Sequence, residues 1–257
     1  MSLPIIATPT YTLKQPSTGK QISYRPFLVK EEKLLLMATQ IDDESEAASE
    51  AVKAIKQIIE NCCEGLDNIE DLPLFDLEYI FLQLRAKSVG EVVEPEIVCS
   101  ECGGHIKLSI DVSKIKVVKP EGHKFDMKIT DDVGVKMKYP SFDLFQRRMV
   151  GSDFTVEQLF DILIDCIDCI YTEEEVHSIN DYSRAEVVTF LESLSQEQFK
   201  KLQDFFETIP RVEHVAKYTC KNKVETEEGP TARCGNKGEV VLSTLNDFFG
   251  WACIMTA

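Results

Sequence analysis

Four of the nine cysteines have the spacing and neighbours of a metal site. Residues 99–102 are a CxxC motif followed by two glycines. Two thiolates at this spacing reach one ion when the turn between them is tight, and glycine allows such a turn. Segments rich in β-branched residues flank the motif. This context favours a zinc-binding loop over the helix-opening CxxC of a redox protein.

The second half of the predicted site is Cys220 and Cys234. We interpret residues 221–233, which separate them, as an insertion into a loop of the same kind, because Cys102 and Cys234 are each followed by glycine. Four thiolates complete a tetrahedral zinc shell and leave no open position, so the predicted site is structural. Its ligands are Cys99, Cys102, Cys220 and Cys234. Four free cysteines remain an alternative, as does His105 in place of one cysteine.

The other cysteines predict neither a metal site nor a catalytic site. Cys166 and Cys169 form a second CxxC, but it falls on a helical stripe of apolar residues from Val156 to Ile170. Buried free cysteine behaves as a small hydrophobic side chain, so we assign this pair to core packing. Cys62 is assigned to the core in the same way, and the adjacent Cys63 has no useful metal spacing.

No motif of an enzyme is present. The sequence lacks a P-loop, GxGxxG after a strand, GxSxG and HExxH, and its four histidines fall in no Ser/His/Asp or Cys/His arrangement. We therefore predict a protein that is not an enzyme, with no catalytic residue and no cofactor other than structural zinc.

Charge and hydropathy narrow the choice of partners. The formal net charge of −16 argues against nucleic-acid binding, which depends on Lys and Arg to neutralise phosphates. A lysine-rich stretch over residues 107–128 predicts a solvated strand face, with a phosphate-binding surface as the alternative. No apolar run approaches the ~20 residues that span a membrane, and the N-terminus lacks a basic signal-peptide region. These features predict a cytosolic protein without membrane or small-molecule partners.

The coarse pattern predicts an α+β fold, with helical core elements around a small β-rich, zinc-ribbon-like unit. Turn residues between alternating segments predict a β-hairpin over residues 11–24. Apolar stripes predict helices beginning near Glu31, within residues 41–62 and over 73–88, the last apolar on most of its surface and therefore central to the core. Three capping boxes, at Thr155–Gln158, Ser183–Glu186 and Ser195–Gln198, predict further helix starts.

We divide the chain at the changes of pattern. Residues 1–90 form the N-terminal hairpin and helices, and residues 91–140 plus 211–242 form the zinc-ribbon-like unit. Residues 141–210 are a helical insertion, and residues 243–257 are an apolar C-terminal tail. If the four cysteines meet, zinc joins segments far apart in the chain and holds a long loop closed.

Three segments resemble the baseplate hub assembly proteins of T4-type contractile-tailed phages: Ser23–Met37, Phe81–Glu91 and Phe160–Tyr171. The resemblance implies a baseplate hub component or hub assembly factor, whose partners are other baseplate hub or tail proteins. It implies a place in the host cytoplasm during assembly, and in the virion tail if the protein is retained rather than released as a chaperone. It assigns no role to any individual residue. The alternative is a zinc-ribbon adaptor that binds nucleic acid or a polymerase.

Overall fold

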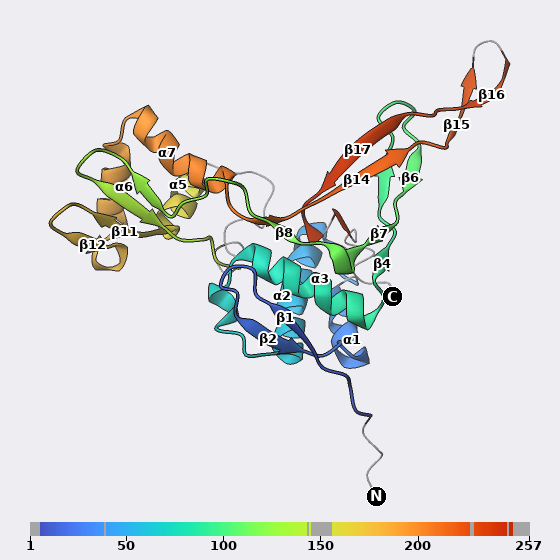
Figure 1. Ribbon diagram of the computed structural model, residues 1–257, viewed down its shortest axis with the longest axis horizontal. Helices are drawn as coiled ribbons and strands as arrows, with labels where there is room; N and C mark the ends of the chain where they lie inside the picture. Colours follow the sequence, from blue (N-terminus) through green and yellow to red (C-terminus); the bar gives the residue numbers. More distant parts are fainter. Residues whose placement is uncertain are drawn as a thin grey trace, which may run out of the picture. The chain divides into compact units, whose positions relative to one another are not determined.

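The computed structural model describes residues 6–38, 40–142, 144, 156–226, 229–245 and 247–248, and the chain forms two compact units. The first unit comprises Met1–Leu66, Phe75–Val117 and Val212–Ala257. The second comprises Asp67–Leu74 and Val118–Arg211. Helices and small antiparallel sheets occur in both units, which confirms the α+β class (Figure 1).

The first unit begins with the predicted hairpin and two helices. Its elements are β1 (Tyr11–Lys14), β2 (Gln21–Tyr24), α1 (Val29–Ala38), α2 (Glu44–Cys62), β3 (Cys63–Glu64) and α3 (Leu74–Ser88). Strands β1, β2 and β3 form one antiparallel sheet. Helix α2 starts where predicted, because the Asp43 side chain accepts a hydrogen bond from the Glu46 N–H.

Helix α3 is the centre of the first unit, as its all-round apolar pattern predicts. Its buried apolar residues include Phe75, Leu77, Ile80, Phe81, Leu82 and Leu84. Burying one such side chain contributes about 1.5–3 kcal/mol. The buried Asp76 fixes the β1–β2 turn to this helix, because it accepts hydrogen bonds from the Gln15 Nε2 atom at 2.8 Å and the Ser17 N–H at 2.9 Å.

An ion pair with a buried carboxylate joins Arg25, the residue after β2, to α1. The fully buried Glu31 accepts a hydrogen bond from Arg25 Nη2 at 2.9 Å and another from the Leu28 N–H at 2.9 Å. Arg25 also donates to the carbonyl oxygen of Asn61 at the end of α2. One charged pair therefore holds the start of α1 and the end of α2 to the sheet.

Two β-ribbons complete the first unit. One is built from β4 (Val92–Val93), β5 (Glu96–Val98), β6 (His105–Lys107) and β7 (Ile110–Asp111). The other contains β14 (His214–Thr219), β15 (Lys223–Thr226), β16 (Gly229–Arg233) and β17 (Lys237–Leu242). We call these two ribbons, residues 92–111 and 214–242, the cysteine arm. The strands predicted on both sides of the cysteines are thus confirmed.

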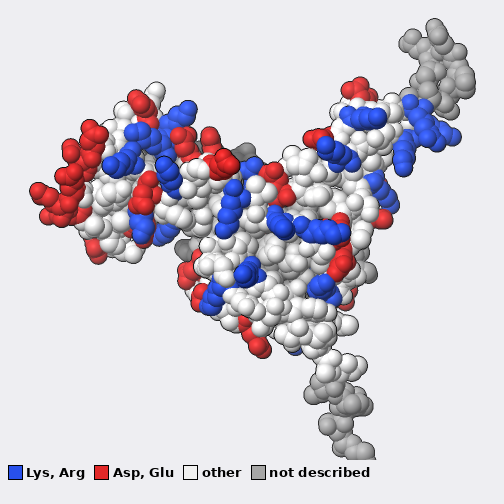
Figure 2. Space-filling view, in the orientation of Figure 1, with Lys and Arg blue, Asp and Glu red and all other residues white. Residues whose placement is uncertain are grey.

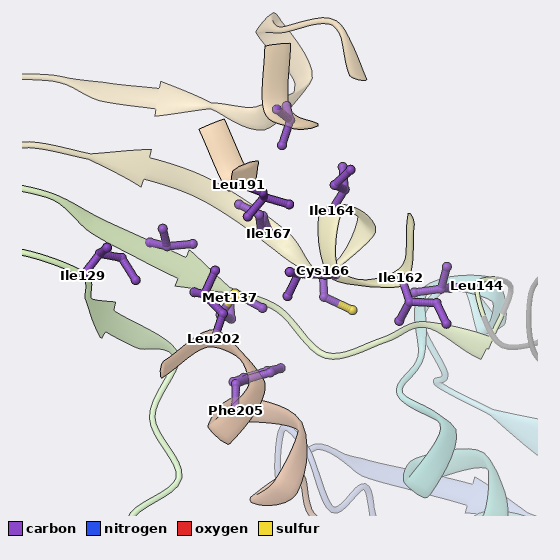
Figure 3. Close-up of a cluster of buried hydrophobic side chains, with 13 residues drawn as sticks. Ile129, Met137, Leu144, Ile162, Ile164, Cys166, Ile167, Leu191, Leu202 and Phe205 are labelled. Atoms are coloured by element: carbon purple, nitrogen blue, oxygen red, sulfur yellow. The ribbon is translucent and has the colours of Figure 1, made fainter. Parts of the chain in front are cut away.

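The second unit packs helices against a four-stranded sheet of order β12-β11-β10-β9. Its elements are β9 (Asp126–Lys128), β10 (Gly134–Met137), α5 (Val156–Asp165), β11 (Ile167–Tyr171), β12 (Val176–Ser178), α6 (Arg184–Glu192) and α7 (Gln196–Glu207). Its core contains Val135, Cys166, Ile167, Leu202 and Phe205 (Figure 3). The chain passes between the units in β8 (Val117–Val118) and β13 (Arg211–Val212), and again before and after Asp67–Leu74.

Side-chain caps and an arginine fix the helices of the second unit. Both capping boxes predicted within the described residues form, at Ser183 with Glu186 and at Ser195 with Gln198. Arg184 in α6 makes ion pairs with Asp161 and Asp165 of α5. These contacts join the N-terminal end of α6 to the C-terminal half of α5.

One predicted helix is wrong in its second half. The apolar stripe from Val156 to Ile170 predicts a single helix, but α5 ends at Asp165 and β11 begins at Ile167. Strand β10 supplies the reason, because Met137 and Val135 pair with the β-branched Ile167 and Ile170. Residues 141–210 consequently contain strands as well as helices.

The division of the chain drawn from its pattern remains a prediction. The capping box at Thr155 and the greater part of the apolar tail, from Phe249 to Ala257, lie outside the described residues.

Candidate metal centre

The tips of the two ribbons bring the four predicted cysteines together. The Sγ atoms of Cys99 and Cys234 are 3.9 Å apart, and those of Cys102 and Cys220 are 3.6 Å apart. All four sulfur atoms lie within 4.8 Å of one another. Ligands around tetrahedral zinc, with Zn–S bonds of about 2.3 Å, are separated by about 3.8 Å. The arrangement therefore has the dimensions of a tetrathiolate metal centre.

The two cysteine loops share one backbone pattern. In the first loop, the Cys99 N–H donates to the Gly104 carbonyl and the Gly103 N–H donates back to the Cys99 carbonyl, both at 2.9 Å. In the second loop, the Cys220 N–H donates to Asn236 at 2.7 Å and the Gly235 N–H donates back to Cys220 at 3.1 Å. The glycines have φ values of +66° and +68°, a conformation that other residues adopt at a cost.

The insertion between Cys220 and Cys234 is a separate hairpin that leaves this loop unbroken. Strands β15 and β16 form it, and Lys223 pairs with Arg233 at its base. Next to this pair, the Cys234 N–H donates to the Asn222 carbonyl at 2.8 Å. Residues 220–222 and 234 consequently stand in the order of a CxxC motif, with the hairpin projecting from it (Figure 1).

Two asparagines, which the pattern of cysteines does not single out, complete the surroundings of the sulfurs. Asn222 Nδ2 donates to Cys102 Sγ at 3.9 Å and to the His105 carbonyl at 3.1 Å. Asn236 Nδ2 donates to Cys99 Sγ at 3.6 Å and to Ser100 Oγ at 3.3 Å. The only signal in the sequence is that each asparagine lies two residues after a cysteine.

Local hydrogen bonds and burial give the thiols different acidities. Backbone N–H groups of Cys102 and Glu101 lower the pKa of Cys99 to about 6. Burial raises the pKa of Cys220 to about 12. Since a metal ion binds the thiolate form, binding at this centre displaces the protons of its less acidic thiols.

The remaining candidates from the sequence are not part of the cluster. The His105 side chain is 69 % exposed and lies 3.7 Å from Glu96 instead. Cys166 is fully buried at the end of α5, which confirms its assignment to the core. Cys62 is also buried in the core, and the adjacent Cys63 is half-buried.

A cavity with a volume of about 790 Å³ lies within the second unit. Its described lining contains neither histidine nor cysteine, and its arginine, Arg184, is paired with Asp161 and Asp165. Ser141 Oγ, also in the lining, accepts a hydrogen bond from the Leu144 N–H. No helix among the described residues combines the length and apolar character needed to cross a bilayer.

The fold and site define an α+β protein whose one assembled chemical group, within the described residues, is a tetracysteine cluster at the tips of two β-ribbons. The chain belongs to the T4 bacteriophage base plate protein family, whose model matches residues 8–250. It is 21% identical over 231 residues to the baseplate hub assembly protein gp26 of Enterobacteria phage T4, covering 90% of this chain and 93% of that protein. No solved structure matches. The family suggested by the three sequence segments is thereby confirmed.

Proposed function

We propose that this chain builds the baseplate hub of a contractile-tailed phage through contacts with other hub or tail proteins. The observation that carries the proposal is the match of residues 8–250 to the model of the T4 bacteriophage base plate protein family. The name of the phage T4 relative, a baseplate hub assembly protein, supports the same role. In this role the chain is a non-enzymatic protein of the host cytoplasm during assembly.

The experiment on function uses the phage that encodes the chain. Deleting the gene is expected to leave tails without a complete hub in electron micrographs, and supplying the chain from a plasmid is expected to restore them. Normal tails from the deletion phage contradict the proposal. Mass spectrometry of purified virions then separates the two versions of the role, since a hub component is present in intact tails and an assembly chaperone is absent.

The proposed cofactor is one structural zinc ion, bound by Cys99, Cys102, Cys220 and Cys234. The sulfur separations of 3.6 and 3.9 Å support it, as do the matched glycines of the two loops. Four thiolates leave no open coordination position, so zinc here stabilises the ribbons and performs no reaction. Zinc binding at such sites supplies folding free energy, on the order of 10 kcal/mol or more in small zinc domains.

Native mass spectrometry tests the metal directly. The purified chain is expected to carry the mass of one zinc ion, and a strong chelator is expected to remove it with a change in hydrogen exchange confined to the cysteine arm. Cys169→Ser is the matched control, because this cysteine lies outside the cluster. A chain that remains metal-free in zinc-containing buffer contradicts the zinc assignment. That result leaves the proposal on hub assembly unchanged.

A further inference from the structure

A basic groove opens on the cysteine arm between β6 and β14. Its volume is about 350 Å³, and three exposed lysines line it: Lys107, Lys217 and Lys221. Thr219, Asn222 and Ser109 add polar side chains to the same lining. Figure 2 shows Lys and Arg side chains gathered on this arm. An exposed local group of cations stands out on a chain whose net charge is −16.

The cations of the groove are only partly neutralised within the described residues. Lys217 lies 3.1 Å from Glu239, its partner on β17. Lys107 and Lys221 have no ion pair among the described residues. This part of the arm therefore keeps positive charge available to a ligand.

Like charges are also held together beside the groove. Lys223 and Arg233 are direct cross-strand partners at the base of the β15–β16 hairpin, and both are exposed. Like charges directly opposite each other destabilise a strand pair. An anionic partner relieves this repulsion, so the arrangement is better suited to the bound state than to the free one.

We propose that this groove is a docking surface for an acidic segment of a protein partner, with carboxylates facing Lys107, Lys217 and Lys221. The inference rests on the proposed function, because it names the chemistry of the partner in the hub. A volume of about 350 Å³ accommodates a few side chains of a partner. The aromatic residue of the lining, Tyr218, lies against Gly238, where a Cβ atom would be 2.7 Å from its hydroxyl oxygen. Its ring is thereby held against the strand instead of presenting a free face to stack on bases.

The test measures fluorescence anisotropy with two labelled probes, an eight-residue peptide of Glu and Asp and a 12-base-pair DNA duplex. Inorganic phosphate is added as an unlabelled competitor. The wild-type chain is expected to bind the peptide at low salt. The double variant Lys107→Glu/Lys221→Glu is expected to bind the peptide about tenfold more weakly, because two exposed attractions become repulsions. Lys14→Glu/Lys116→Glu changes the net charge equally at exposed sites of the same unit and is expected to leave affinity within about twofold.

Three outcomes overturn the proposal. The first is an equal loss of peptide affinity in both double variants. The second is tighter binding of the duplex than of the peptide. The third is loss of the metal from Lys107→Glu/Lys221→Glu, because these lysines would then stabilise the metal centre instead of binding a partner. Plasmid complementation of the deletion phage separates this inference from the proposed function. If the wild-type chain restores hubs and the groove variant does so equally well, the docking surface alone is wrong. If deletion leaves hubs intact, the proposed function is wrong, whatever the peptide does.

Discussion

Asn236 lies two residues after Cys234 and donates a hydrogen bond to Cys99, a cysteine of the other ribbon whose Sγ atom is 3.9 Å from that of Cys234. Asn222 has the same relationship to its own neighbours. It lies two residues after Cys220 and donates to Cys102, which is paired with Cys220. The side chain of each asparagine, on the ribbon of residues 214–242, therefore contacts a sulfur atom on the ribbon of residues 92–111. Such contacts orient metal ligands and balance their negative charge without competing for the metal.

Asn236→Ala is expected to speed the transfer of zinc to a chelator about tenfold, the lower end of the effect of removing a group that supports metal ligands. The variant removes one N–H donor from Cys99 and one from Ser100 while leaving the four cysteines in place. Stopped-flow absorbance with a colorimetric chelator measures the rate. Asn180→Ala, an exposed asparagine of the second unit, is the control, and equal rates for the two variants contradict a role for Asn236.

Deleting Lys223–Arg233 is expected to leave a chain that still binds one zinc ion. The deletion joins Asn222 to Cys234 and creates an ordinary CxxC, Cys-Lys-Asn-Cys. The two residues are already hydrogen-bonded neighbours, N to O at 2.8 Å, so the loop closes with little movement. Native mass spectrometry gives the metal content. Loss of zinc from this variant shows instead that the β15–β16 hairpin is required to form the centre.

Cys220→Ser is expected to release the metal and expose the arm to solvent. Cys220 is one of the two buried cysteines of the cluster, and its loss leaves three of the four proposed zinc ligands. Hydrogen exchange is expected to rise in residues 92–111 and 214–223 while α3 stays protected by its own core. Unchanged exchange in both ribbons indicates that the arm is stable without metal.

Glu31→Gln is expected to destabilise the first unit by about 2 kcal/mol at pH 7, since hydrogen bonds to charged groups are strong and Arg25 loses its partner. Burial acts to raise the pKa of Glu31, but hydrogen bonds from Arg25 and Leu28 lower it overall. A carboxyl whose pKa is lower in the folded chain contributes fully above its unfolded pKa, about 4.3. That contribution is lost as the pH falls through the folded value.

The difference between the wild type and Glu31→Gln is therefore expected to be largest near pH 7 and to shrink below about pH 4. Urea unfolding followed by hydrogen exchange of α1 and α2 measures it. Glu32→Gln, one residue along the same helix, provides the control because Glu32 has no ion pair among the described residues. A difference that persists unchanged to pH 3 contradicts the assignment to the charge of Glu31.

Local signals in the sequence predict most elements of the first unit. Turn residues between Tyr11 and Tyr24 predict the hairpin, and Pro73 with an apolar helix pattern predicts α3. The α5–β11 boundary is different. Ile167 and Ile170 fit a helical stripe and a strand equally well, and only the approach of β10 decides between them. The residues of β10 that pair with them, Met137 and Val135, lie 30 and 35 positions earlier in the chain, beyond the reach of a local pattern.

The cluster was predictable to the extent that its signals are local. Glycines after Cys102 and Cys234 indicate two similar loops, and the four sulfurs meet as expected. The predicted insertion covers residues 221–233, whereas the hairpin starts only at Lys223. Lys221 and Asn222 therefore belong to the second cysteine loop. The roles of Asn222 and Asn236 depend on the direction of each amide across the two ribbons, which spacing along one ribbon does not specify.

The order of the cysteines along the chain determines when each one becomes available during synthesis on the ribosome. Cys102 is separated by 118 positions from Cys220, and Val118–Arg211, the larger part of the second unit, is encoded between them. At bacterial elongation rates, the later cysteine follows on the order of 10 s after the earlier one. Residues 118–211 are therefore synthesised before the last cysteine of the cluster, Cys234, is added. We expect the proposed zinc ion to be captured only after Val118–Arg211 and Cys234 have both been synthesised.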